Sequence, residues 1–429
     1  MVEKKLKKNF SFLFSENILR LGLGFFISVW MARHLGPEGY GKFTYVISLI
    51  NLFLPLYILG SDEVVTKFFL IEKENLGSTV GTGFSIKLIG ALLSIIIINC
   101  ISFSLRPNEP LMKMAILFYS ISMGFQAFGV INNYYQSRVE ENRTSILRNF
   151  VFIPITGLKV LWIIEGNGWE SFIWLSCAEV VIVALLYLVY FSKNHFSPVK
   201  WNFDRGKFQK MLSLCLPFFM VLFLEQAIFK IDQLMVGEML GDDALGQYGA
   251  ANKLVNLWNF IPIAFVSTLF PTLLEGFNEG QKQYAEVKRL LLGGLFWFSL
   301  IFALAVTSFG GLVVDVMYGE KYSQTGSLLR LYSWVTILSY FTMARSKLLL
   351  VQGDLFLNVI IMLVISLTNI VLNYFLIPSY GAWGAIYATI LSLFLGILLM
   401  IFDRSGRELL YDFYKGVFIV PIKVFGKQR

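Results

Sequence analysis

Ionisable side chains lie inside long apolar segments of this chain, and their types indicate what chemistry they could do. A charge at membrane depth is costly and usually faces a partner or a water-filled cavity. Glu225 and Asp232 are seven residues apart, so they lie on one helix face two turns apart. We predict that one of these carboxylates binds a coupling proton or Na⁺. The alternative is a structural carboxylate that pairs with a neighbouring helix.

Basic side chains occur inside apolar segments of both halves of the chain. Fixed ammonium and guanidinium groups can replace the lost hydration of a phosphate. Structural interpretations stay open, because Arg20 follows Glu16 by four residues and could neutralise it. Lys87 could extend to a membrane interface, and Arg330 lies near the start of its segment. The candidates for a cationic cavity from this pattern are Arg20, Lys87, Lys159, Lys253 and Arg330.

The sequence offers little for enzymatic or metal chemistry. Its three cysteines and two histidines are not spaced as metal ligands. The segment 36–42 has the spacing of a phosphate-binding P-loop, but Phe43 follows where Ser or Thr is needed. We interpret this segment as a turn between two helices. We therefore predict no catalytic residue, no metal site and no cofactor, apart from H⁺ or Na⁺ coupling.

The elements that carry these side chains are predicted from apolar length. Hydrophobic residues make up 56% of the 429 residues, and only 15% are charged, so most of the outer surface must face lipid. The mean hydropathy is +0.66. Continuous apolar runs near 20 residues recur along the chain and exclude both a soluble core and an alternating β-barrel. We predict an all-α integral membrane protein of about twelve helices.

The predicted spans follow one another with short connections. They cover residues 10–32, 39–60, 79–103, 111–135, 146–165, 170–191, 208–238, 244–273, 289–317, 325–350, 355–377 and 380–402.

Basic residues predict the orientation of these spans. With the N-terminus in the cytoplasm, most of the 36 Lys and Arg residues fall on the cytoplasmic side, whereas Arg33, Arg106, Lys113 and Lys321 fall opposite. This positive-inside imbalance places both termini in the cytoplasm. The net charge of +8 is then explained by topology and does not indicate nucleic-acid binding.

The two halves of the chain share one plan. Leu35-Gly36, Gly41 and Asn51-Leu52 recur at a constant offset as Leu240-Gly241, Gly246 and Asn256-Leu257. A parallel repeat of six helices predicts two lobes related by a pseudo-two-fold axis along the membrane normal, with a central cavity. The predicted domains are an N-terminal lobe (1–191), a cytoplasmic linker (192–207), a C-terminal lobe (208–402) and a cytoplasmic or interfacial tail (403–429).

Three segments resemble one transporter family. Ala32–Phe43, reading ARHLGPEGYGKF, is similar to polysaccharide or O-antigen flippases of the Wzx type, within the multidrug/oligosaccharidyl-lipid/polysaccharide exporter superfamily. Asp232 with Leu240–Ala251 resembles the family's seventh and eighth spans, and Asn373–Ala385 resembles its turn between spans eleven and twelve. Lys67 stands where the family often has Arg after the second span, which keeps the charge but loses bidentate geometry.

The resemblance implies a function. Such proteins move an undecaprenyl-pyrophosphate-linked oligosaccharide repeat unit from the cytoplasmic to the periplasmic leaflet of the bacterial inner membrane. Alternating access, driven by an ion gradient, is the implied mechanism. The implied partners are the lipid-linked oligosaccharide, the bilayer, a glycan polymerase and a chain-length regulator. Lys67 joins the candidate substrate-binding residues on this ground.

Three other functions stay open. A multidrug exporter of the same superfamily should have an acidic or aromatic cavity for organic cations, which the buried basic residues disfavour. A membrane-embedded glycan polymerase or ligase should carry a large outer loop, whereas the loops at 106–110 and 165–170 are short. A flippase for peptidoglycan precursors is a closer variant.

Overall fold

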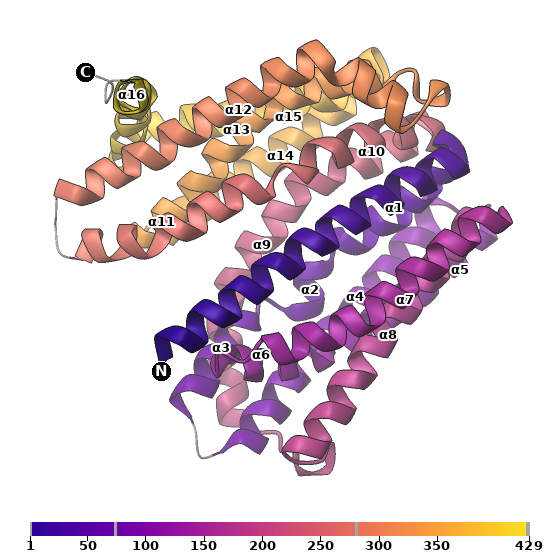
Figure 1. Cartoon of the computed structure of the whole chain (residues 1–429), viewed down its shortest axis with the longest axis vertical. Coiled ribbons are helices and arrows are strands. Elements are labelled where there is room, and N and C mark those ends of the chain that lie inside the picture. Colours follow the sequence, from indigo (N-terminus) through magenta and orange to yellow (C-terminus); the bar gives the residue numbers. More distant parts are fainter. Residues whose placement is uncertain (1, 73–74, 279–281, 426–429) are drawn as a thin grey trace. The chain divides into compact units, whose positions relative to one another are not determined.

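The computed structural model describes residues 2–72, 75–278 and 282–425 (Figure 1). Within these ranges every regular element is helical. The chain forms two compact units, and each is described by itself. Unit 1 comprises Met1–Leu35 and Lys42–Lys230, and unit 2 comprises Gly36–Gly41 and Ile231–Arg429. The predicted linker 192–207 therefore lies within unit 1, and residues 426–429 of the predicted tail lie outside the described part.

Unit 1 contains the helices from α1 to α8 and the larger part of α9, apart from residues 36–41 of α1. Long apolar segments form its spanning helices, and shorter pieces occur where spans are broken. Its helices are α1 (Val2–Leu52), α2 (Leu54–Ile58), α3 (Asp62–Ile71), α4 (Leu76–Leu105), α5 (Pro110–Gly124), η1 (Phe125–Gly129), α6 (Val130–Ser137), α7 (Asn142–Glu165), α8 (Trp169–Asn194), η2 (Pro198–Lys200) and the larger part of α9 (Arg205–Leu240).

Unit 2 contains the end of α9 and all later helices. Antiparallel neighbours such as α12 with α13, and α14 with α15, make its most extensive packing. Its further helices are α10 (Asp242–Leu257), α11 (Phe260–Asn278), α12 (Lys282–Met317), η3 (Glu320–Tyr322), α13 (Thr325–Gln352), α14 (Leu355–Tyr380), α15 (Ala382–Leu399), η4 (Met400–Phe402) and α16 (Arg404–Phe425).

The helices agree with the predicted spans. Among the described residues, ten candidates are long and apolar enough to cross a membrane. The first candidate, Leu19–Ile71, covers residues 19–32 of the first predicted span and the whole of the second. The predicted span 325–350 forms α13 but is not one of the ten, because Arg330, Arg345 and Lys347 interrupt its apolar sequence.

The internal repeat has the same backbone features in both copies. Gly36 and Gly241 adopt nearly identical backbone conformations with positive φ, at φ/ψ of 70°/174° and 90°/176°. A residue with a side chain would be strained in this conformation, whereas glycine is not. Gly36 produces the kink inside α1 where the sequence predicts a turn. Further on, the helix breaks at Phe53 in the first copy and at Trp258 in the second. The repeat thus specifies matching bends and matching breaks.

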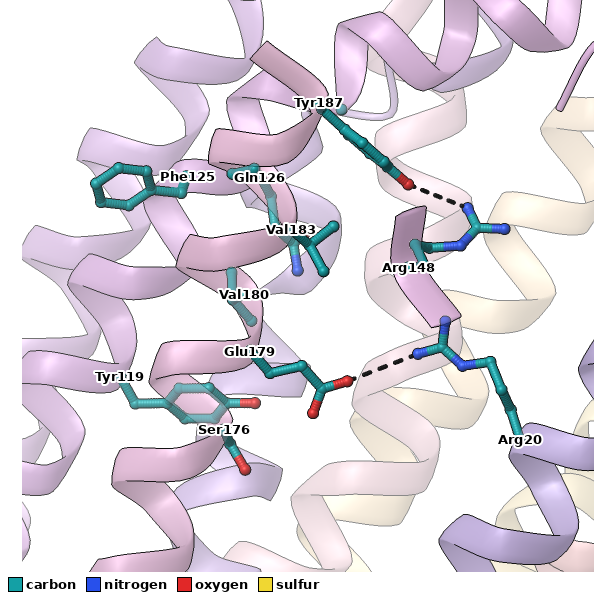
Figure 2. A pocket seen from close by; sticks show the side chains of 12 residues that line it. Arg20, Tyr119, Phe125, Gln126, Arg148, Ser176, Glu179, Val180, Val183 and Tyr187 are labelled. Carbon is teal, nitrogen blue, oxygen red and sulfur yellow. Dashed lines mark hydrogen bonds and ion pairs between the residues drawn. The ribbon is translucent and has the colours of Figure 1, made fainter. Parts of the chain in front are cut away.

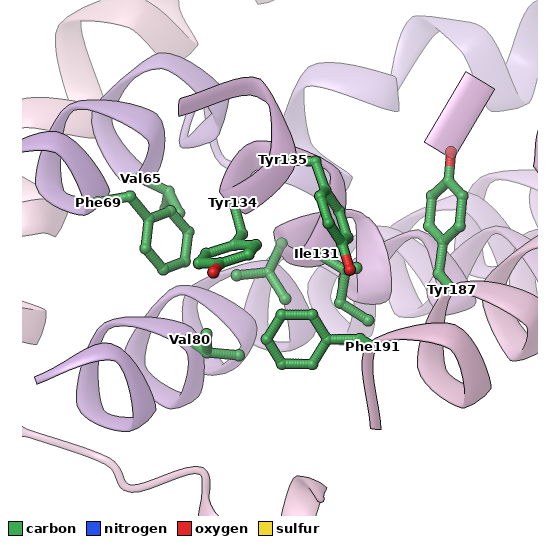
Figure 3. Packing of buried hydrophobic residues seen from close by; sticks show 9 residues of the cluster. Val65, Phe69, Val80, Ile131, Tyr134, Tyr135, Tyr187 and Phe191 are labelled. Carbon is green, nitrogen blue, oxygen red and sulfur yellow. The ribbon is translucent and has the colours of Figure 1, made fainter. Parts of the chain in front are cut away.

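An aromatic core holds the short helices of unit 1 in place (Figure 3). Phe69 of α3, Tyr134 of α6 and Phe191 of α8 meet edge to face, with Tyr134 5.5 Å from Phe69 and 5.4 Å from Phe191 between ring centroids. Such pairs add stabilisation beyond their buried area. Tyr187 of α8 belongs to the same cluster and also reaches the pocket described below.

The tail forms a helix, α16, that packs along α12 (yellow in Figure 1). Asp412 of α16 is buried and accepts contacts from Lys288 Nζ at 2.6 Å and Arg289 Nε at 2.7 Å. The indole of Trp297 donates to the carbonyl of Val417 at 2.8 Å. A salt bridge that is largely removed from water therefore fixes this helix to unit 2.

Candidate functional site

A charged pocket of about 370 Å³ opens in unit 1 between α1, α5, α7 and α8 (Figure 2). Arg20 of α1 and Arg148 of α7 lie on one side, and Glu179 and Tyr187 of α8 face them. Arg20 Nη2 lies 3.7 Å from Glu179 Oε1, and Arg148 Nη1 donates to the Tyr187 hydroxyl at 3.5 Å. The pocket therefore presents two guanidinium groups inside a membrane-spanning unit.

The acidic groups around the pocket only partly neutralise its positive charge. Glu16 is 6% exposed and lies 3.9 Å from Arg20 Nη1 and 3.8 Å from Arg148 Nη2. Neither of its carboxylate oxygens has a hydrogen-bond partner within the described residues. Lys159 Nζ lies 3.5 Å from Glu179 Oε2. Three cationic groups thus share two carboxylates at loose distances, which suits a site where an anion can insert.

A second polar cluster surrounds Asp232 in the apolar interior of unit 2. Asp232 of α9 is 1% exposed. Asn373 Nδ2 of α14 donates to its Oδ1 at 2.6 Å, and the Tyr248 hydroxyl of α10 donates to its Oδ2 at 3.4 Å. The Thr389 hydroxyl of α15 also donates to Oδ2, and Asn369 Oδ1 accepts from Asn373. Four helices therefore bring neutral oxygen and nitrogen groups to one buried carboxylate.

One buried oxygen atom of this cluster accepts no hydrogen bond from the described residues. Asn373 is fully buried, yet its Oδ1 has no hydrogen-bond partner among the described residues. Leaving such an acceptor unsatisfied costs about 1–3 kcal/mol. Carboxylate, amide and hydroxyl oxygens are the ligands that a hard cation prefers. These oxygen groups are therefore chemically suited to a small cation or a proton, and the prediction that either Glu225 or Asp232 binds one stays a prediction.

The other candidate residues do not line the unit 1 pocket and lie on different helices. Lys87 of α4 is 1% exposed and forms an ion pair with Asp62. It does not line the pocket itself, although its Nζ lies beside Gly129, which does. Lys67 is exposed on α3, and Lys253 is exposed on α10. Arg330 of α13 is exposed and its guanidinium lies over Gly311 of α12. Glu225, half-buried on α9, belongs to unit 1, whereas Asp232 belongs to unit 2.

Some residues of both sites were not among the sequence-based candidates. Arg148 is one of them, and its position near the start of an apolar span is a signal in the sequence that marks it. Asn369 and Asn373 are four residues apart on one helix face, which is a signal for paired polar groups inside an apolar run. Neither signal indicates that the partner is Asp232, because that contact is set by helix packing.

Comparison with known proteins places the chain in a family. A family profile described as "Polysaccharide biosynthesis protein" matches residues 6–277, which is more than half of the chain. The chain belongs to this polysaccharide biosynthesis protein family. A second profile, MatE, matches residues 217–375. With ten apolar helices of spanning length among the described residues, this family member is a multi-pass membrane protein.

Individual relatives agree with this assignment. The chain is 20% identical to a putative O-antigen transporter of Shigella flexneri over 86% of its own length and 91% of that protein. It is 23% identical to a probable low-salt glycan biosynthesis flippase of Haloferax volcanii, with 89% and 79% covered. The lipid II flippase MurJ, in an inward closed conformation, has a similar fold. The TM-score is 0.70 at 18% identity, over 96% of this chain and 91% of MurJ.

Proposed function

We propose that this family member is a flippase for lipid-linked oligosaccharides. Its cargo is an undecaprenyl-pyrophosphate-linked repeat unit, carried from the cytoplasmic to the periplasmic leaflet of a bacterial inner membrane by alternating access. The paired guanidinium groups of Arg20 and Arg148 in the unit 1 pocket are the observation that carries this proposal. The relatives named for O-antigen transport and glycan flipping support it.

The pocket supports recognition of the pyrophosphate. Guanidinium groups bind phosphate oxygens through paired hydrogen bonds that are stronger than those between neutral groups. Glu16 and Glu179 lie 3.7 to 3.9 Å from the two arginines. Exchange of these long contacts for short contacts to phosphate favours binding, because the arginines are already oriented.

The Asp232 cluster supports ion coupling. A cation or proton bound at Asp232 would neutralise this buried carboxylate inside the membrane. Binding of H⁺ or Na⁺ would therefore change the charge of a site where α9, α10, α14 and α15 meet. Such a change can favour one conformation of a transporter over another.

Cells that lack this protein test the proposal. We expect them to accumulate lipid-linked repeat units in the cytoplasmic leaflet, where a membrane-impermeant glycan-modifying reagent cannot reach them. The wild-type chain should restore surface glycan. Arg148→Gln should reduce restoration by about 10- to 100-fold, since a charge-assisted hydrogen bond contributes about 1.5–3 kcal/mol.

The control is Arg404→Gln, which removes a guanidinium that is 88% exposed on α16 and should restore glycan at the wild-type level. Repeat units that reach the outer leaflet normally without this protein would overturn the flippase proposal. A normal yield of surface glycan from Arg148→Gln would remove the pocket from the substrate path.

The MatE match over residues 217–375 raises a second candidate, an exporter of organic cations. The excess of guanidinium and ammonium groups around the unit 1 pocket opposes a cationic cargo by like-charge repulsion. Resistance of expressing cells to a panel of cationic dyes measures this alternative directly. We expect resistance equal to that of cells carrying an empty vector.

A further inference from the structure

The membrane span made by α10 and α11 is interrupted near its middle. The candidate span runs from Asp242 to Phe277, but α10 ends at Leu257 and α11 begins at Phe260. Pro262 lies in the first turn of α11 and cannot donate a helical hydrogen bond, which favours the break. A discontinuous span of this kind often marks a binding site in transporters.

Polar and aromatic side chains are exposed at this break. Asn256 is exposed, Trp258 is 42% exposed, and Asn259 is partly exposed. Lys253 is exposed one turn before Asn256 on the same face of α10. Amide groups are poorly suited to lipid, so this face meets water or a polar ligand.

A continuous chain of contacts connects this face to Asp232 through the interior of unit 2. The Tyr248 hydroxyl donates to Asp232 Oδ2 at 3.4 Å, and the Tyr248 ring meets the Tyr332 ring edge-on at 5.7 Å. Asn252 Nδ2 donates to the Tyr332 hydroxyl at 2.7 Å. The chain therefore crosses from α10 to α13 and back within a few side chains.

The chain then continues along the α10 face to the break. Asn256 Nδ2 donates to Asn252 Oδ1 at 2.6 Å, and Asn259 Nδ2 donates to Asn256 Oδ1 at 2.8 Å. The Tyr340 hydroxyl of α13 donates to Asn259 Oδ1 at 3.0 Å. The four hydrogen bonds from Tyr340 to Tyr332 all donate in one direction. The step from Tyr332 to Tyr248 is the edge-on ring contact, and Tyr248 then donates to Asp232. Donors aligned in one direction polarise one another.

We propose that Asn256 and Asn259, with the ring of Trp258, contact the saccharide part of the cargo, and that Asn252, Tyr248 and Tyr332 position them according to the occupancy of Asp232. The inference rests on the proposed function, whose cargo supplies the saccharide. Amides both donate and accept hydrogen bonds, and an aromatic ring offers an apolar face. These are the groups that match sugar hydroxyls and sugar C–H faces.

The positioning role follows from the direction of the donors. An ionised Asp232 attracts the Tyr248 hydroxyl and favours the aligned chain behind it. A cation or proton at Asp232 removes that attraction, so the preference for one arrangement of the α10 amides weakens. The buried ion site and the exposed saccharide face are thereby linked through side chains of α10 and α13 alone.

Hydrogen–deuterium exchange of the purified full-length protein tests the link. Exchange of peptides covering residues 252–263 is compared in NaCl and in choline chloride of equal ionic strength, and at two proton concentrations in choline chloride. We expect Na⁺ or H⁺ to change the exchange rate of this segment several-fold in the wild type. Tyr332→Phe and Asn252→Leu should abolish that change while the ion still raises the thermal midpoint.

Tyr318→Phe is the matched control, because it removes a buried tyrosine hydroxyl in unit 2 that has no hydrogen-bond partner among the described residues. It should keep both the exchange response and the thermal response. An unchanged response of the segment in Tyr332→Phe and Asn252→Leu overturns the positioning role. The positioning role is also overturned if neither Na⁺ nor H⁺ changes the exchange rate of residues 252–263 in the wild type.

Restoration of surface glycan tests the saccharide contact. Asn256→Leu should lower it several-fold, whereas Thr268→Val, at an exposed polar position of α11 beyond the break, should not. If the wild-type chain restores no glycan, the proposed function fails. If the wild type restores glycan and Asn256→Leu restores it equally well, only the saccharide contact fails.

Discussion

At the scale of single residues, burial changes the meaning of a charge inside an apolar segment. Arg20 lies in a pocket with Arg148 and with carboxylates at 3.7 Å or more, as the proposed anion site requires. Lys87 has the same kind of sequence context, yet its ammonium is fully buried against Asp62. Asn133 Nδ2 also donates to Asp62 Oδ1 at 3.2 Å. The arrangement around Lys87 holds α3, α4 and α6 together.

This ion pair predicts an asymmetric response to mutation. Lys87 is 1% exposed and Asp62 is 48% exposed, so only Asp62 can be hydrated when its partner is lost. Asp62→Asn should lower the free energy of unfolding by about 3–5 kcal/mol, because it leaves a buried ammonium unpaired. Lys87→Met should cost clearly less. Thermal midpoints of the purified variants measure both effects.

The double variant Asp62→Asn/Lys87→Met completes the cycle and should recover much of the stability lost in Asp62→Asn. Equal losses in the two single variants would contradict the burial argument. If the double variant lost the sum of both single losses, the two side chains would not be energetically coupled.

At the scale of helices, the two copies of the sequence repeat pack against each other, and each contributes one glycine to the contact. A Cβ atom built on Gly41 would lie 1.8 Å from the carbonyl oxygen of Asp242, and one built on Gly246 would lie 1.9 Å from that of Pro37. These four residues correspond in pairs under the repeat and all belong to unit 2. Glycine is therefore required in both copies, because two helix segments pack backbone to backbone.

Gly246→Ala should consequently destabilise the protein. No neighbouring flexible side chain can move aside, since the atom in the way is a backbone carbonyl. The expected cost is about 1–3 kcal/mol of overpacking, measured as a lower thermal midpoint. Gly157→Ala is the control, because a Cβ there meets nothing within 4 Å. Equal midpoints for the two variants would show that the segments are not packed this closely.

At the scale of the whole molecule, the distribution of basic residues predicts the orientation in the membrane. Alkaline phosphatase fused at Gly166 should be active, because this loop is predicted to face the periplasm, whereas fusion at Arg138 should be inactive. Green fluorescent protein at the C-terminus should fluoresce. Immunoblots of the fusions control for expression, and an active phosphatase at Arg138 would reverse the proposed orientation.

The sequence alone determined the class of this protein. The apolar runs could be counted and bounded because a bilayer demands about 20 apolar residues per helix. The repeat anticipated the matching bends at Gly36 and Gly241, since a left-handed conformation selects glycine. Ten apolar helices among the described residues and the family match confirm the all-helical membrane architecture.

The tertiary structure decided which charges work together. Asp232 and Thr389 are far apart in the chain, and only the packing of α9 against α15 makes them partners. The same holds for Arg20, Arg148 and Glu179 in the pocket, and for Tyr332 with Asn252 behind the α10 face. A sequence shows which side chains share a face of one helix. Which face of which other helix they meet depends on side-chain packing across the whole fold, and that packing separates the paired Lys87 from the arginines of the pocket.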